Sequence, residues 1–169
     1  MAKSIVSHVS NASAGILGPL QSLQRNAVDM VLNTGGLAIG TGVNTKVKLV
    51  NTIYALIDGV LVKKTTAEVV LSGTVTNAKF NVFVISMTAD GTLTATMGTE
   101  GTTIGAVVFP TIPASSVVLG FIIVNPTGTG DFVGATTALD DATVVPNVVY
   151  VNTPYPFNPN AIALGLSLS

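Results

Sequence analysis

The chain has 169 residues, of which 48% are hydrophobic and only 9% are charged. Soluble domains carry roughly 25% charged residues, so a mean hydropathy of +0.66 indicates a membrane protein or a surface that partners largely cover. A net charge of −1 gives no electrostatic reason to bind nucleic acid, and the absence of cysteine excludes disulfides, thiolate nucleophiles and cysteine-based zinc sites.

The apolar runs are too short for a membrane-spanning helix, which needs about 20 successive apolar residues. The run at residues 117–124, for example, ends at Asn125-Pro126. The first eight residues include one basic residue, but no continuous apolar core of the kind that an export signal needs follows it. We therefore expect no membrane partner and a chain that is made in the cytoplasm of its host cell.

The N-terminal part predicts an irregular arm followed by one short helix. Residues 1–18 are rich in Ser, Ala and Gly, and Pro19 suits the first turn of a helix. Four apolar residues then recur at helical spacing, namely Leu20, Leu23, Ala27 and Met30. The Asn-Thr-Gly-Gly sequence at 33–36 should end the helix. Such a helix docks on its own domain or forms a short stem between copies of the chain.

Residues 37–152 predict β-structure throughout. Strands are expected at 46–50, 52–57, 60–64, 68–71, 80–87, 92–97, 117–124 and 147–151. Asp58-Gly59 lies between two apolar runs and predicts a tight hairpin, because both turn residues tolerate positive φ. Ser72-Gly73 and Asp90-Gly91 mark further turns. Lys63-Lys64 is expected to be solvated or to protect a strand at a sheet edge.

This spacing of strands and turns favours an antiparallel β-sandwich or a jelly-roll-like domain over a sheet with crossover helices. The expected fold is therefore mainly β, with a short N-terminal helix and extended termini. We divide the chain into an arm with its helix at 1–36, a β-domain at 37–152 and a tail at 153–169.

The tail combines prolines with apolar side chains. Its proline-rich part includes Tyr155 and Phe157, and proline excludes a central strand there. The last residues alternate small or polar side chains with large apolar ones, among them Ile162, Leu164 and Leu166. This segment forms an ordinary last strand or adds a strand to the sheet of a neighbour. These five residues, together with the four apolar residues of the expected helix, are the candidate contacts between subunits.

The sequence contains no recognised catalytic motif, and we expect no catalytic residue and no cofactor. A catalytic Ser-His-Asp set would have to recruit the single histidine, His8, which lies in the expected arm and is expected to be an ordinary surface residue. Asp131, Asp140 and Asp141 cluster in a loop-rich stretch, where carboxylates hold a hard cation or, more commonly, cap turns. No calcium-loop pattern surrounds them, so no metal is predicted.

Three segments carry a resemblance: residues 112–124, residues 132–137 and residues 150–153, all rich in Val, Thr, Gly or Ala. With the N-terminal arm and helix and the lack of cysteine, the chain resembles small virion structural proteins of tailed bacteriophages. Capsid decoration (cement) proteins and head-fibre proteins are the most similar kinds. The resemblance covers residues 45–155 and rests on no single diagnostic motif.

The resemblance implies a non-catalytic protein of the virion that decorates or cements a phage capsid. Its partners would be further copies of itself, with a trimer preferred, and the major capsid protein or another virion protein. Two other classes stay open. A receptor- or carbohydrate-binding module of a fibre or tail would use exposed aromatic residues such as Tyr54 or Tyr150. A two-carboxylate glycosidase would have to pair its acids, and Glu68 and Glu100 are the only glutamates.

Overall fold

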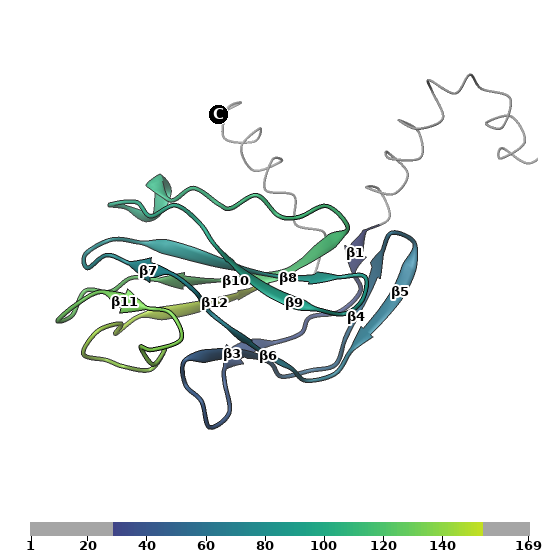
Figure 1. Cartoon of the computed structure of the whole chain (residues 1–169), viewed down its shortest axis with the longest axis horizontal. Coiled ribbons are helices and arrows are strands. Elements are labelled where there is room, and N and C mark those ends of the chain that lie inside the picture. Colours follow the sequence, from purple (N-terminus) through teal and green to yellow (C-terminus); the bar gives the residue numbers. More distant parts are fainter. Residues whose placement is uncertain (1–28, 154–169) are drawn as a thin grey trace, which may run out of the picture.

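The computed structural model describes residues 29–153, which form a mainly β fold (Figure 1). The strands in chain order are β1 (Met30–Val31), β2 (Leu37–Ile39), β3 (Lys46–Leu49), β4 (Ile53–Ile57), β5 (Val60–Lys64), β6 (Glu68–Val70), β7 (Thr74–Val75), β8 (Asn81–Thr88), β9 (Leu93–Met97), β10 (Ser116–Val124), β11 (Phe132–Val133) and β12 (Val148–Asn152). Within this range the one helical element is the 3-10 turn η1 (Ile104–Ala106).

The strands form four small sheets, and every strand pair is antiparallel. The largest has the order β12-β10-β8-β9, two others have the orders β1-β4-β5 and β2-β3-β6, and β11 pairs with β7. Most connections join strands of the same or a neighbouring sheet through short turns. The expectation of a mainly β, antiparallel fold is confirmed.

Strand β8 lies at the centre of the structure and is buried on both faces. Phe83, Ile85 and Met87 point into the main hydrophobic core, whose other members come from all four sheets. The alternate residues Val82 and Val84 are equally buried but lie outside that core cluster. A strand that is covered on both faces needs an almost continuous apolar sequence, and β8 has one.

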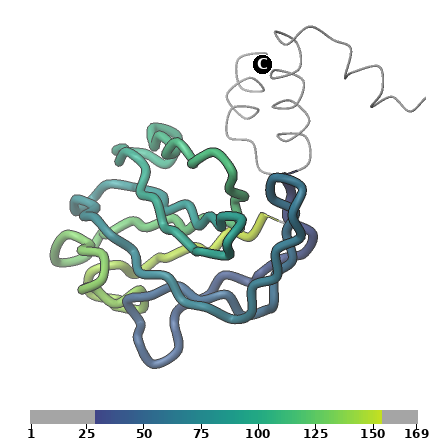
Figure 2. Tube along the Cα trace, turned by 45° about the vertical axis from the view of Figure 1, so that its right-hand side comes forward, coloured from purple at the N-terminus to yellow at the C-terminus, as the bar shows by residue number. Residues whose placement is uncertain are grey.

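The segment between β9 and β10 covers the second face of the large sheet. It is held by backbone pairing of Thr99 with Val108, and of Phe80 with Gly101. The ring of Phe109 packs edge-to-face on the ring of Phe121 in β10, with the centroids 5.2 Å apart. Figures 1 and 2 show this green segment on one side of the large sheet and β2, β3 and β6 on the other.

The two Asp-Gly turns form hairpins, as the sequence predicts. Asp58 and Gly59 both have positive φ, 51° and 76°, which the two-residue turn between β4 and β5 requires. Gly91, with φ of 80°, ends the turn between β8 and β9, and its N–H donates to the carbonyl of Thr88 at 2.9 Å. The predicted strands appear as β3, β4, β5, β6, β8, β9, β10 and β12, with bounds that differ by at most one residue at either end.

Two features differ from the predictions. The helix was expected to reach Met30, but Met30 and Val31 form β1 and pair with Leu56 and Ala55 of β4. Apolar residues such as these are compatible with a helix face and with a strand. Backbone pairing with the edge of β4 favours the strand. The short strands β2, β7 and β11 were not predicted, since two or three residues show no period. The remainder of the predicted helix lies outside the described residues.

Candidate interaction surfaces

The outer face of the β1-β4-β5 sheet exposes a row of large apolar side chains. Met30, Leu56 and Leu61 lie opposite one another across the three strands. In the next row the Leu32 N–H donates to the Tyr54 carbonyl at 2.9 Å, and Tyr54 lies opposite Lys63. Leu32 is 52% exposed and Leu61 is 63% exposed. We call these six residues the hairpin face.

The hairpin face exists because both faces of the β4–β5 hairpin are apolar. The alternate residues Ile53, Ala55, Ile57 and Val62 point inward and are buried in the core. The residues between them in the sequence, Tyr54, Leu56 and Leu61, point to the opposite face, which does not pack against the core of the described residues. Lys63 stands over the Tyr54 ring, with its Nζ 6.0 Å from the ring centroid. An exposed apolar patch of this kind on a soluble protein commonly marks a contact with another macromolecule.

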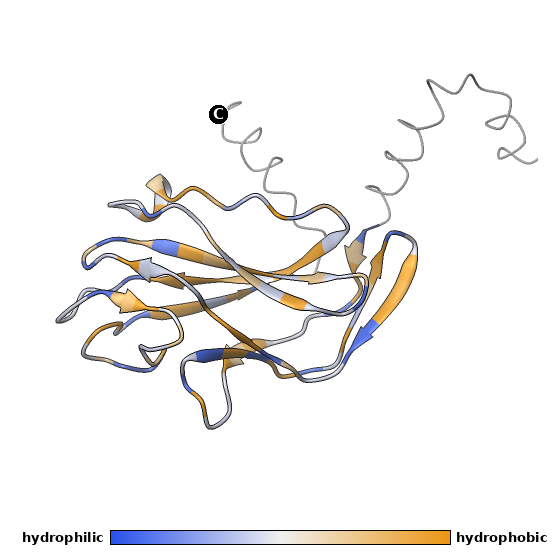
Figure 3. Ribbon diagram, viewed as in Figure 1, coloured by the Kyte–Doolittle hydropathy of each residue, from blue (hydrophilic) through white to orange (hydrophobic). Residues whose placement is uncertain are grey.

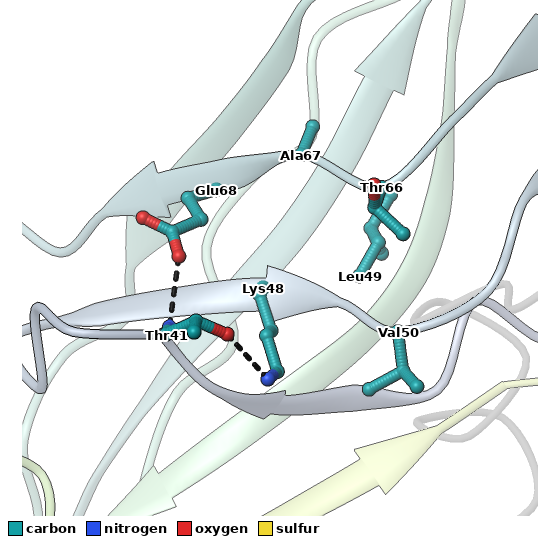
Figure 4. A pocket seen from close by; sticks show the side chains of 7 residues that line it. All are labelled: Thr41, Lys48, Leu49, Val50, Thr66, Ala67 and Glu68. Atoms are coloured by element: carbon teal, nitrogen blue, oxygen red, sulfur yellow. Dashed lines mark hydrogen bonds between the residues drawn. The ribbon is translucent and has the colours of Figure 1, made fainter.

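A shallow pocket of about 380 Å³ lies on the β2-β3-β6 sheet (Figure 4). Glu68 accepts a hydrogen bond from the Thr41 N–H at 2.9 Å, and its other carboxylate oxygen lies 3.9 Å from the Nζ of Lys46. Lys48 Nζ donates to the Thr41 hydroxyl at 2.7 Å. The polar groups of this pocket therefore largely satisfy one another, and the remaining wall is formed by Leu49, Val50, Thr66 and Ala67.

A second pocket, of about 240 Å³, lies beside β12. Tyr150 and Asp140 line it together with apolar residues. Burial, with a smaller contribution from the Asp140 charge, raises the pKa of Tyr150 to about 12. The carboxylate of Asp140 accepts a hydrogen bond from the Asn44 side-chain amide at 2.8 Å. The phenol therefore keeps its proton even in alkaline solution in which an exposed tyrosine would ionise.

The three clustered aspartates have separate structural partners. Asp131 accepts the backbone N–H of Asn77 at 2.8 Å, and Asp140 is bound by Asn44. Asp141 accepts both the N–H and the hydroxyl of Thr143, at 2.9 and 2.6 Å. In residues 29–153 no group of three His, Cys, Asp or Glu side chains is arranged to hold a metal ion.

Two further carboxylates are held ionised by hydrogen bonds. Lys79 donates to Glu100 at 2.6 Å and Thr76 donates both its N–H and its hydroxyl at 2.9 Å, which lowers the pKa of Glu100 to about 2. The hydroxyl of Thr88, and the N–H and hydroxyl of Thr92, lower the pKa of Asp90 to about 2. Hydrogen bonds from Thr143 likewise lower the pKa of Asp141.

Most of the residues predicted to contact other subunits fall outside the described residues: Leu20, Leu23, Ala27, Tyr155, Phe157, Ile162, Leu164 and Leu166. Met30 is described and lies half-buried in β1, on the hairpin face. Sequence reasoning missed the hairpin face itself. The available signal was a hairpin that is apolar at every position of β4 and at the first three positions of β5, although it lies at one side of the fold.

No helix within residues 29–153 is long and apolar enough to cross a membrane. A scan against models of protein families finds no match to this chain, and searches of curated proteins and of solved structures find none.

Proposed function

We propose that this chain is a non-catalytic structural protein of a virion, which decorates or cements the capsid of a tailed bacteriophage. The observation that carries the proposal is the hairpin face, where Leu32, Tyr54 and Leu61 are exposed beside the half-buried Met30 and Leu56, in a chain with few charges. Contact with another protein would bury these apolar side chains and so remove them from water, which is energetically favourable. Its place of action would be the virion, after synthesis in the host cytoplasm.

We also propose that the fold is a β-sandwich of the jelly-roll-like kind. Inward residues of the large sheet, such as Ile85 and Ile122, share one core cluster with Val47 of β3 and Ile53 of β4. This sharing favours two layers that enclose one core, with the β12-β10-β8-β9 sheet as one layer. The second layer would be formed by the two three-stranded sheets. Such a body is stiff and offers broad sides for lateral packing.

The titration behaviour of the carboxylates favours a structural role. A general acid needs a raised pKa, so that its proton is still present near neutral pH. The carboxyl groups of Asp90, Glu100 and Asp141 have lowered pKa values, because hydrogen bonds to turns and loops stabilise their ionised forms. These side chains serve as turn caps and braces, and the lowered pKa of Glu100 disfavours it as the general acid of a glycosidase.

The proposed partners are further copies of the chain, with a trimer preferred, and the major capsid protein or another virion protein. In this account the terminal segments make the contacts within the trimer, and the surface of the β-domain contacts the neighbouring virion proteins. Cementing follows from mass action. A protein that binds only the assembled shell stabilises it by about 2.7 kcal/mol per site at a hundredfold excess over Kd.

The test is the thermal rupture of otherwise identical particles prepared with and without this chain. The proposal expects rupture at a lower temperature without it, and recovery when purified chain is added back. The rescued effect should persist in high salt, because few charges take part. Equal rupture temperatures, together with a loss of attachment to host cells, would contradict cementing and favour the receptor-binding alternative.

The alternative, a receptor- or carbohydrate-binding module, has one supporting observation. Tyr54 is 39% exposed on the hairpin face and offers an aromatic platform beside Lys63. Substitution of Tyr54 by Ala would then abolish attachment to cells and leave particle stability unchanged. Under the cementing proposal the same variant would lower particle stability and leave attachment unchanged.

A further inference from the structure

Strand β5 is an edge strand with an exposed apolar surface. In the sheet order β1-β4-β5 it pairs with β4 on one side, and no other strand of the described residues pairs with its second side. Leu61 is the most exposed large hydrophobic residue of residues 29–153, at 63%. Val60, also in β5, is 53% exposed. Figure 1 shows β5 at the outer margin of the molecule. An exposed edge strand is a template for pairing with another chain, and the two lysines that end β5 disfavour such pairing unless the partner brings acidic groups beside them.

Hairpin geometry fixes which residues of β5 offer their backbone groups. In a two-residue hairpin the residues that flank the turn, here Ile57 and Val60, form a hydrogen-bonded pair. The backbone groups of alternate residues then point away from β4. Leu61 and Lys63 therefore direct their N–H and C=O groups to the open edge, ready for another strand.

The two ends of β5 carry opposite charges. The turn at its start holds Asp58, whose N–H donates to the Asp29 carboxylate at 2.6 Å, so two acidic residues lie together there. Its end holds Lys63 and Lys64. Figure 3 shows this change along β5, from hydrophobic at its start to hydrophilic at its end. An antiparallel arrangement of two such strands brings the basic end of each beside the acidic turn of the other.

We infer that the β5 strands of two copies pair antiparallel about a two-fold axis at Val62. In this register Leu61 of each copy lies opposite Lys63 of the other, and the two three-stranded sheets become one sheet of six strands. The aliphatic stem of each lysine then covers the leucine across the axis, while its ammonium group reaches toward the acidic turn. A parallel arrangement would place the lysines together and is disfavoured.

A two-fold contact also explains how such an edge avoids unlimited aggregation. Each copy uses its one open β5 edge, so this contact closes on itself and neither β5 edge stays free to add a further copy. The inference rests on the proposed oligomer and names one of its interfaces. It is separate from the terminal contacts that would form the trimer, and it links copies in pairs.

Disulfide trapping tests the register directly, because the natural chain contains no cysteine. The full chain with Leu61→Cys and Lys63→Cys places two cysteines opposite each other across the axis, with Cα atoms about 5.5 Å apart, within the range that a disulfide spans. Mild oxidation should give a species of twice 17.1 kDa on a denaturing, non-reducing gel. The matched control is Val149→Cys with Val151→Cys on β12, another edge strand, which should stay at the mass of one chain.

A charge-exchange series tests the same contact without cross-linking. Leu61→Lys sets lysines opposite each other twice and should weaken pairing about tenfold or more. Adding Lys63→Glu to that variant restores opposite charges across both pairs and should restore association. Val70→Lys on β6 places the same charge on a different exposed strand and should change nothing. Light scattering over a dilution series gives the association, and thermal unfolding verifies that each variant is folded.

The outcomes separate this contact from the wider proposal. If the natural chain is oligomeric but the cysteines on β5 do not cross-link, the two-fold contact is wrong and the oligomer stands. If the β5 cysteines are shielded from thiol reagents yet do not cross-link, another segment or partner covers the edge, which also overturns the inference. If the natural chain is a monomer at every concentration, the oligomer itself is wrong.

Discussion

At the scale of single residues, the few charged side chains of this protein have local structural tasks. Glu100 joins Thr76 and Lys79 and so connects the end of β7 to the start of β8. Asp90 and Asp141 each bind a threonine two residues further along the chain. A threonine at that position supplies both an N–H and a hydroxyl, which is why the ionised carboxylate is favoured. The sequence predicted turn caps of this kind for Asp141, but not the bridge made by Glu100.

These carboxylates predict a loss of stability in acid. The pKa of Glu100 falls from 4.5 to about 2 and that of Asp90 from 3.8 to about 2 on folding. Between these values the unfolded chain binds more protons than the folded chain, so the free energy of unfolding decreases as the pH falls through this window. Above this window both groups are ionised in the folded and the unfolded chain, so their contribution to the free energy of unfolding no longer changes with pH. Urea unfolding from pH 7 to pH 2 measures the effect.

Glu100→Gln identifies the contribution of one group. The variant should be less stable than the natural chain at pH 7, because the charge-assisted bonds to Lys79 and Thr76 are weakened. It should also lose less stability between pH 4.5 and pH 2. An acid decline as steep as that of the natural chain would show that Glu100 does not contribute to it.

Gly120 predicts a large effect of a small change. It follows a bulge in β10, and a Cβ atom there would lie 2.3 Å from the Val151 carbonyl oxygen and 2.7 Å from the side chain of Leu37. Gly120→Ala should therefore destabilise the fold by about 1–3 kcal/mol or more. Gly130→Ala is the control, since nothing lies within 4 Å of the added atom. Urea unfolding that gives equal midpoints for both variants would contradict this packing.

At the scale of elements, the sequence predicts what is periodic and misses what is short. The strands β8 and β10 are long apolar runs, and Asp58-Gly59 is a strong hairpin signal, so these elements follow directly. The helix prediction failed at Met30, because its apolar residues also satisfy the edge of β4. Strands β7 and β11 pair with each other although they lie far apart in the sequence, and β2 pairs with the following strand β3. A run of only two or three residues has no period that could specify any of the three.

Phe132 shows how a very short strand is held. Its side chain is fully buried and packs edge-to-face on Phe83 of β8, with ring centroids 5.9 Å apart. Phe132→Ala should cost about 3–5 kcal/mol, through the lost apolar burial and the cavity that remains. Val133→Ala, at an exposed neighbouring position of β11, is the control and should cost far less. Urea unfolding of both variants measures the difference, and similar costs would contradict the role of Phe132 as the anchor of β11.

At the scale of the whole molecule, the low charge and the hairpin face are the two features on which the proposal of protein partners rests. The sequence predicted an association-prone chain from its composition and assigned the contacts to the termini. The hairpin face was missed because alternation cannot reveal it. Apolar residues lie on both sides of the β4–β5 hairpin, and only its position in the fold shows which side faces the core of the described residues 29–153. The predicted contact residues of the termini stay predictions.

Truncation tests the assignment of contacts to the two ends. Deletion of residues 1–17 or 161–169 should reduce the mass of the assembly, since each buried leucine, isoleucine or valine contributes roughly 1.5–3 kcal/mol. Thermal unfolding of the β-domain should change little. Light scattering measures the first quantity and circular dichroism the second. Normal assembly of both truncated chains would assign the contacts to the faces of the β-domain.

The most direct test of a decorating role is binding of the purified chain to shells that lack it. Shells are mixed with increasing amounts of the chain, sedimented, and the bound chain is counted against the major capsid protein. The account predicts saturation at a fixed ratio, at high as well as low salt, and weaker binding by Leu61→Lys if the hairpin face takes part. A chain that stays in the supernatant at every concentration, while the shells remain intact, would contradict the account.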